Sequence, residues 1–172
     1  MLYLLLICIT VVATHLPMSF GQTLFHYRLG HRPLGGLFFH NHISFHHTYY
    51  AKEHLVSGKY LADEGNNTPF FLIPVAVVAL AAYFILPLPL FVAQIAAMSA
   101  SFFAHVYVDK HYHVAGSWLS SFAWFQRRQQ LHFVHHLHAD SNFALIDNFW
   151  DSLLGTYRSP PADYLPRNNR AD

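Results

Sequence analysis

Leu131-His-Phe-Val-His-His-Leu-His-Ala-Asp140 is the stretch around which the rest of this chain is organised. His132, His135 and His136 stand at positions i, i+3 and i+4, which on an α-helix share one face with Cβ atoms about 5–6 Å apart. Three imidazoles on one face can converge on a single metal ion. The alternative interpretation is a polar helix face in water, but clusters of histidine recur elsewhere in the chain.

Histidine is abundant in this chain, whereas charged residues are scarce. The 172 residues include 15 histidines, more than the 10 lysines and arginines together, and only 11% of residues are charged. Soluble domains average about 25% charged residues, so a membrane protein is the first expectation. The net charge of +1 gives no reason to expect a nucleic-acid partner. A single cysteine, Cys8, excludes both an intrachain disulfide and a Cys-rich zinc site.

Three segments are apolar and long enough to cross a bilayer. Residues 1–25 are expected to form the first span. Residues 69–108 are expected to form a transmembrane hairpin, because this range carries no charged residue and has Pro87 and Pro89 near its middle. A buried hairpin in a soluble bundle is the alternative. The prediction is an all-α, integral-membrane helical bundle with about three spans, in which residues 1–172 form a single domain.

A polar stripe runs along the first expected span, formed by His15, Ser19, Gln22 and His26. We expect this stripe to face the bundle interior rather than lipid. His15 lies about 16 Å from His26 at 1.5 Å per residue, too far to share a metal ion with it. An interhelical hydrogen bond is the more natural role for His15.

All lysines and arginines fall after the first span and outside the hairpin. Three spans place them on one side of the membrane, and the bias of these residues toward the cytoplasm makes that side cytoplasmic. The histidine clusters lie on the same side. The sequence therefore predicts a cytoplasmic helical cap built from residues 26–56 and 109–158, with a loosely held tail at 159–172, in a bacterial inner membrane or the endoplasmic reticulum.

Helical periodicity leaves one choice open in the segment 37–56, where a helix is expected. At 100° per residue, His42, His46 and His47 span about 140°, whereas His40, His47 and His54 form a separate stripe. Spacing alone does not decide whether His40 or His42 completes this cluster. Further helices are expected at residues 118–138 and 148–154.

A last cluster follows the hairpin in His105-Val-Tyr-Val-Asp-Lys-His-Tyr-His113. His105, Asp109 and His113 share a stripe at i, i+4 and i+8, and His111 lies on another face of a regular helix. One metal ion takes three to six ligands, so the nine or ten imidazoles of all clusters suggest two ions. Imidazole suits iron, zinc, copper and nickel about equally.

The order of these clusters resembles the fatty acid hydroxylase/sterol desaturase superfamily. The residues that carry the resemblance are His26-x4-His31, His42-x3-His46-His47, His132-x2-His135-His136, then Asn142-Phe143 and Trp150-Asp-Ser-Leu-Leu-Gly-Thr156. Members carry HX(3–4)H, HX(2–3)HH and HX(2–3)HH boxes, and the resemblance covers roughly residues 22–158. It implies an integral-membrane non-haem di-iron oxygenase that hydroxylates or desaturates a C–H bond of a lipid substrate. It also implies O2 and electrons from an external donor, such as a cytochrome b5-like protein, a ferredoxin or a reductase.

The resemblance further implies two bound iron ions, with zinc possible in the isolated protein. Eight ligands match the boxes residue by residue: His26, His31, His42, His46, His47, His132, His135 and His136. Relatives draw a further histidine from the region after the third span, for which His111, after Asp109, is the better match by sequence, while His113 and His105 stay open. Asp109 is expected to orient a ligating imidazole from behind.

Some residues depart from the pattern of the superfamily. Ile43 stands where the shorter HX2HH spacing would put histidine, Ala144 follows Asn142-Phe143 instead of glycine, and Ser152-Leu-Leu replaces Arg-Leu-Phe. The chain also has fewer spans than the usual four or so. These differences leave the substrate open.

Two other functions compete with an oxygenase. A haem-binding electron carrier would hold each haem between two histidines on facing spans inside the bilayer. A metal-transport or storage protein would place Asp or Glu inside the membrane along a pathway. Against the haem carrier, the histidines cluster near the expected membrane surface rather than inside the bilayer. Against the transport or storage protein, the hairpin spans carry no acidic residue.

Overall fold

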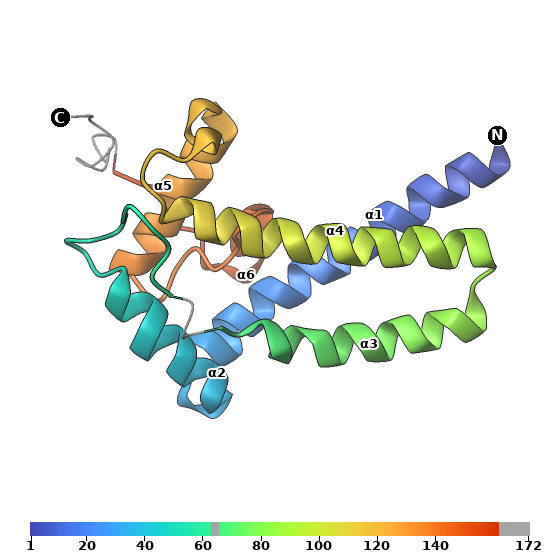
Figure 1. Cartoon of the computed structure of the whole chain (residues 1–172), viewed down its shortest axis with the longest axis horizontal. Helices are drawn as coiled ribbons and strands as arrows, with labels where there is room; N and C mark the ends of the chain where they lie inside the picture. Colours follow the sequence, from blue (N-terminus) through green and yellow to red (C-terminus); the bar gives the residue numbers. More distant parts are fainter. Residues whose placement is uncertain (63–65, 162–172) are drawn as a thin grey trace.

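The computed structural model describes residues 1–62 and 66–161, and these two ranges are helical with connecting loops (Figure 1). Three long helices, α1 (Leu2–Phe25), α3 (Thr68–Ile85) and α4 (Leu88–Tyr112), extend from a cap of shorter helices. In the described ranges the one β-bridge is isolated, between Ser57 and Val114. The predicted all-α bundle is confirmed.

The three long helices have the length and composition of membrane spans, over Leu2–Gly30, Thr68–Ile85 and Leu88–Tyr112. Their apolar side chains point outward: Ile73 on α3 is 71% exposed, and of the residues of α3 only Ala82 is buried. A helix that is apolar all round and exposed within its own chain is suited to contact with lipid. The chain is therefore a membrane protein with three candidate spans.

The spans meet the cap at the same end. α1 and α4 both run toward the cap, whereas α3 runs away from it and joins α4 through a turn at Leu86 and Pro87 (Figure 1). Proline suits the start of α4 because it fixes φ and lacks the N–H that a helix start leaves unpaired. α4 continues to Tyr112, four residues beyond the end of the hairpin predicted at residue 108.

Polar contacts tie α1 to α4 within the spans. His15 Nδ1 lies 3.2 Å from Ser101 Oγ, which confirms the predicted interhelical hydrogen bond of His15. Its Nε2 lies 2.9 Å from Asp147 of the cap. Ser19 and Gln22 are buried, so the polar stripe of the first span faces the bundle as predicted.

The cap differs in detail from the predicted helices. The expected helix at 37–56 is a short α2 (Leu37–His40) followed by a π-helix, η3 (Asn41–His47), and helical backbone ends near Tyr49. The expected helix at 118–138 is divided into a 3-10 turn, η5 (Trp118–Ser121), and α5 (Ala123–Leu137). The division falls at Phe122, whose backbone is extended. The short helix expected at 148–154 is α6 (Phe149–Leu154), and residues 162–172 of the predicted tail lie outside the described ranges.

A small hydrophobic core fixes α5 against the end of α4. It consists of Val108, Tyr112, Leu119, Phe125 and Leu145. The Tyr112 hydroxyl donates to the Leu145 carbonyl at 2.6 Å, and Gln129 Nε2 donates to the Tyr112 carbonyl at 2.8 Å. Because these buried polar groups are paired with backbone, the rotation of α5 about its axis is fixed. That rotation decides where the histidines of α5 point.

Candidate metal centre

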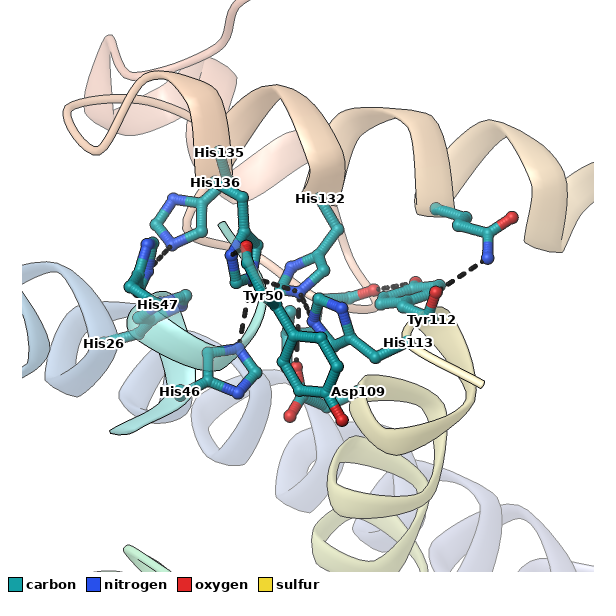
Figure 2. Close-up of polar contacts among 12 residues, drawn as sticks. His26, His46, His47, Tyr50, Asp109, Tyr112, His113, His132, His135 and His136 are labelled. Atoms are coloured by element: carbon teal, nitrogen blue, oxygen red, sulfur yellow. Dashed lines mark hydrogen bonds and ion pairs between the residues drawn. The ribbon is translucent and has the colours of Figure 1, made fainter. Parts of the chain in front are cut away.

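Nine histidines from four segments gather in two groups where the cap meets the spans. Figure 2 shows the four-histidine group together with His26, His47 and His135 of the other group. The five-histidine group consists of His26, His31, His42, His47 and His135. The four-histidine group consists of His46, His113, His132 and His136. Within each group, one ring nitrogen of every member lies within 4.8 Å of those of the others.

In the five-histidine group the ε nitrogens face one another. His26 Nε2 lies 2.9 Å from His42 Nε2, which in turn lies 3.0 Å from His31 Nε2. His47 Nε2 is 3.1 Å from that of His42 and 3.2 Å from that of His135. Five nitrogens of one kind therefore surround one point.

The four-histidine group is built in the same way. His132 Nε2 lies 2.8 Å from His113 Nε2 and 3.1 Å from His136 Nε2. His46 Nε2 lies 3.1 Å from His136 Nε2. Tyr50 stacks on the His113 ring, with centroids 3.9 Å apart and planes at 14°, and closes one side of this group.

Two π-helices bring together histidines that an α-helix would separate. His26 and His31 are five residues apart, and so are His42 and His47, a spacing of about 140° at 100° per residue. The backbone is π-helical over His26–Gly30 and Asn41–His47. The i→i+5 hydrogen bonds of a π-helix align residues five apart, and such segments are frequent at functional sites. Both pairs consequently belong to the five-histidine group.

Neighbouring histidines in the sequence serve different groups. His46 belongs to the four-histidine group and His47 to the other, and the same division separates His136 from His135. The rings of His47 and His136 stack across the boundary, with centroids 4.3 Å apart and planes at 21°. The two groups are therefore in direct contact through these two rings and form one centre.

Backbone carbonyls set the orientation of four of these rings from behind. His26 Nδ1 donates to the Phe143 carbonyl at 2.6 Å, and His135 Nδ1 donates to that of Ser141 at 2.7 Å. His113 and His136 make the same contact with the carbonyls of Leu55 and Tyr50, at 2.8 and 3.0 Å. A proton held on Nδ1 leaves the Nε2 lone pair directed into the group, the usual device that orients histidine ligands of metals.

The loop that supplies two of these carbonyls is held by Asn142 and Asp151. Asp151 is fully buried and accepts from the backbone N–H groups of Phe143 and Ala144 at 2.7 and 3.0 Å and from the Thr156 hydroxyl at 2.8 Å. Hydrogen bonds to a charged group contribute about 1.5–3 kcal/mol each. The segment that closes the sequence motif thus positions the loop behind the five-histidine group.

Asn142 occupies an unusual backbone position in the same loop. Its φ is +54°, and in the described ranges it is the one non-glycine residue with positive φ. Asparagine tolerates this left-handed region better than most side chains. Its amide donates to the Leu131 and Arg158 carbonyls at 3.1 and 2.9 Å and accepts from the Arg158 N–H at 2.8 Å.

Burial favours the neutral form of the cap histidines that belong to the two groups. Desolvation, reinforced by repulsion between neighbouring imidazoles, lowers the pKa of His42, His46, His47, His132, His135 and His136 well below the usual value. Burial lowers the pKa of His113 to about 3, although its bond to the Leu55 carbonyl opposes the shift. Neutral imidazole is the form that binds metals, so the groups are prepared as ligands at neutral pH.

The donor set of both groups fits metal ions. Two nitrogens bound at about 2.1 Å and at right angles around one ion lie about 3.0 Å apart, close to the separations of 2.8–3.2 Å between the ε nitrogens. Without a cation, lone pairs would face lone pairs in a buried site, which costs free energy. His132 Nδ1 is also buried without a partner in the described part of the chain. An all-imidazole set suits iron, zinc, copper and nickel, and it does not choose among them.

The structure favours His113 over His111, contrary to the match by sequence. α4 ends at Tyr112, and the backbone of His113 leaves the helix so that its ring joins the four-histidine group. His111 stays on the helix, where its Nδ1 lies 2.9 Å from Ser117 Oγ and its ring contacts Tyr107. The bridge between Ser57 and Val114 holds His113 in place, a long-range contact that sequence spacing does not show.

The role predicted for Asp109, to orient a ligating imidazole, stays a prediction, and its contact is with a histidine of the four-histidine group. Its Oδ1 lies 3.5 Å from His132 Nε2, the nitrogen that faces the group. Asp109 therefore lies beside the four-histidine group (Figure 2).

The open question at His40 and His42 is answered by the geometry. His42 belongs to the five-histidine group, whereas His40 is exposed and contacts Ser44. His54 is exposed on the loop beyond η3. His105 belongs to neither group and lines the cavity beside them.

A cavity of about 290 Å³ opens next to both groups. Its walls include His26, His42 and His46, with Asp109 and Lys110 on the α4 side. The remaining walls are largely apolar, formed by Phe38, Phe71, Phe102 and Leu145, among others. A small molecule in this cavity would touch histidines of both groups. We refer to it as the histidine cavity.

Comparison of the chain with protein-family models, with curated proteins and with solved structures gives no match. Fold and site therefore define the class: an all-helical membrane protein with two adjoining histidine groups that could hold metal ions.

We predict that His113→Ala lowers the metal content by one ion per chain, whereas His111→Ala leaves it unchanged. His113 supplies one of four nitrogens to its group, and His111 supplies none. Elemental analysis of the two purified variants measures the difference. Loss of metal from His111→Ala with retention in His113→Ala would show that the sequence match, rather than this geometry, identifies the ligand.

We also predict that the metal-free protein loses stability as the pH falls below about 6.5. His113 has a pKa of about 3 in the folded chain and 6.5 in the unfolded one, so the unfolded state binds more protons between these values. Stability then falls with decreasing pH by about 1.4 kcal/mol per unit for each such histidine. Thermal unfolding in detergent from pH 8 to pH 5 measures this. Equal midpoints at both pH values would mean that the histidines are not buried in neutral form, and the exposed His54→Ala is the control.

Proposed function

We propose that this chain is a membrane-bound non-haem di-iron oxygenase that hydroxylates or desaturates a C–H bond of a lipid. The observation that carries the proposal is the pair of adjoining all-imidazole groups beside a largely apolar cavity, at the end of three candidate membrane spans. The resemblance to the fatty acid hydroxylase/sterol desaturase superfamily supports the same function. All eight histidines matched to the boxes lie in the two groups.

The closing motif adds support because its residues have a physical task. Asn142 and Asp151 hold the loop whose carbonyls orient His26 and His135. Replacing groups that orient metal ligands typically costs 10–100-fold in metal affinity or activity. The motif that resembles the superfamily therefore contains the residues that hold the ligand-orienting loop in place.

The residues of the chain provide ligands, orientation and a shielded cavity. Five ε nitrogens would hold one ion and four would hold the other, while Asp109 lies beside the second set. The chemistry supplied when iron is bound is the reductive activation of O2, which these side chains lack on their own. Phe38, Phe71 and Phe102 shield the cavity from water, and a confined site positions a C–H bond close to the centre.

A lipid substrate and an external electron donor complete the proposal. The cavity lies where α3 begins and α4 ends, so a molecule from the bilayer reaches it without crossing water. Electrons come from a separate protein, such as a cytochrome b5-like carrier, a ferredoxin or a reductase. The sequence has no flavin or nicotinamide motif and no haem-attachment motif of its own.

Two alternatives are less well supported by the geometry. A haem needs a flat space between two axial histidines, whereas the ε nitrogens here approach to 2.8–3.2 Å. A metal-storage protein has no need of an apolar cavity against its ligands. The histidine cavity is the feature that favours an enzyme over a non-enzymatic metal-binding protein.

We further propose that the cap faces the cytoplasm. Arg28 and Lys110 lie at the cap ends of their spans, and the remaining lysines and arginines lie in the cap or tail segments. The preference of these residues for the cytoplasmic side supports this orientation.

The oxygenase proposal is tested by growing cells that express the chain under 18O2 and analysing their lipids by mass spectrometry. We expect a lipid that gains 18O or a double bond, and two iron ions per chain in protein purified without oxygen. His135→Ala, which removes a ligand from the five-histidine group, is expected to reduce product to background, while His111→Ala retains it. Stoichiometric iron with no labelled or desaturated lipid would refute the oxygenase assignment.

The orientation is tested with a single thiol in the cap. Asp140 is exposed, so Asp140→Cys in a Cys8→Ser background carries one reactive site on the cap. We expect an impermeant maleimide to label it only after the membrane is permeabilised. Labelling in intact cells would place the cap outside the cytoplasm.

A further inference from the structure

A second cavity is lined by residues of α1, α3 and α4, the three helices that are candidate spans. Its volume is about 370 Å³, and its walls are mainly apolar, including Pro17 and Met18 of α1, Val75 and Val78 of α3 and Met98 of α4. Because its walls belong to the candidate spans, the cavity is suited to a molecule that comes from the lipid phase. We call it the intramembrane cavity.

Phe71 is part of the walls of both cavities. Its ring stacks on Phe25, with centroids 5.6 Å apart, and meets Phe38 edge-on at 5.5 Å. On the other side the ring lies 6.4 Å from Phe102 and 6.2 Å from His105. Among the described residues that line the two cavities, Phe71 is the one that both share, so this side chain at the start of α3 lies at the border between them.

The intramembrane cavity contains a buried amide that lacks a hydrogen-bond acceptor. Gln22 lines the cavity and is 3% exposed, and its Nε2 has no partner in the described part of the chain. An unpaired N–H away from water costs free energy, so an acceptor oxygen on a bound molecule would relieve it. Gln22 precedes His26 by four residues, or about 6 Å along the helix.

The residues that line the cavity are also spread along the helix axes. Gln94, whose Oε1 is likewise unpaired among the described residues, lines it from α4. The contact between His15 and Ser101 fixes the register of α1 and α4, which run the same way. Gln22 is seven residues after His15 and Gln94 seven before Ser101, so they lie roughly 20 Å apart along the axes. An extended chain fits this shape better than a compact molecule.

We propose that the intramembrane cavity binds the extended apolar chain of an oxygen-bearing lipid, with Gln22 donating to its oxygen and Phe71 gating its passage to the histidine cavity. This inference rests on the proposed function in taking that lipid to be the substrate. The oxygen held at Gln22 places carbons a few bonds away near His26, beyond the Phe71 ring. The substrate class is then an oxygenated lipid rather than a plain hydrocarbon.

The experiment uses two photoreactive probes of equal length, a long-chain ketone and the matching hydrocarbon, each with a diazirine in the chain. The full chain, purified in lipid nanodiscs, is irradiated with each probe, and the labelled peptides are identified by mass spectrometry. We expect the ketone to label residues 13–25 and 71–78 several-fold more than the hydrocarbon. Equal labelling by the two probes would overturn the role of Gln22.

Gln22→Met keeps the length of the side chain and removes its N–H. We expect this variant to label equally with both probes, while the control Thr10→Val, on α1 but outside the cavity, keeps the preference. If the variant misfolds, competition in the wild-type chain gives the same test: excess unlabelled ketone should displace the ketone probe, and excess alkane should not. A preference that survives Gln22→Met, or equal displacement by alkane, refutes the proposal.

The gate is tested at Phe71 with the same probes. Phe71→Ala should increase labelling of the histidine-cavity residues Phe38 and Leu145, and Phe71→Trp should decrease it, with labelling of residues 13–25 unchanged. Unchanged labelling of Phe38 and Leu145 in both variants would show that Phe71 is not a gate.

Labelling needs neither iron nor turnover, which separates this inference from the proposed function. Labelling as expected in an iron-loaded chain that neither incorporates 18O into a lipid nor introduces a double bond would refute the oxygenase and retain the lipid site. Incorporation of 18O without labelling of residues 13–25 would refute the lipid site in the intramembrane cavity and retain the oxygenase.

Discussion

The convergence of nine ε nitrogens on two points is the constraint on which the rest of the structure depends. Each nitrogen carries a lone pair in the neutral ring, and burial lowers the pKa of His132, His135 and His136, so these rings stay unprotonated. Such an arrangement is costly in a buried site unless cations occupy both points. The carbonyls behind His26, His113, His135 and His136 hold the rings in this orientation. Occupation of these two points by cations would therefore be coupled to the folding of the cap.

The other parts of the cap can be understood as supports for that convergence. The π-helices align histidines five residues apart, and the split of His46 from His47 and of His135 from His136 makes the two groups share walls. Asp151 fixes the loop behind the five-histidine group, and the bridge at Ser57 fixes the segment of His113. The spans then place this centre at the end of the apolar segment, within reach of molecules from a bilayer.

Apolar length and the position of prolines were enough to predict the three spans and the hairpin turn. The positions of the box histidines were predicted by resemblance, and all eight lie in the two groups. Periodicity at 100° per residue did not decide between His40 and His42, because the backbone there is π-helical. The contact of His113 with Leu55 and the approach of Asp109 to the inner nitrogen of His132 depend on pairs of residues distant in the sequence. Local spacing carries no information on such pairs.

The most direct test of the account is anomalous X-ray diffraction from crystals of the iron-loaded protein, recorded on both sides of the iron absorption edge. We expect two iron peaks per chain, one among the ε nitrogens of His26, His31, His42, His47 and His135 and one among those of His46, His113, His132 and His136. A single peak, or peaks away from these nitrogens, would contradict it.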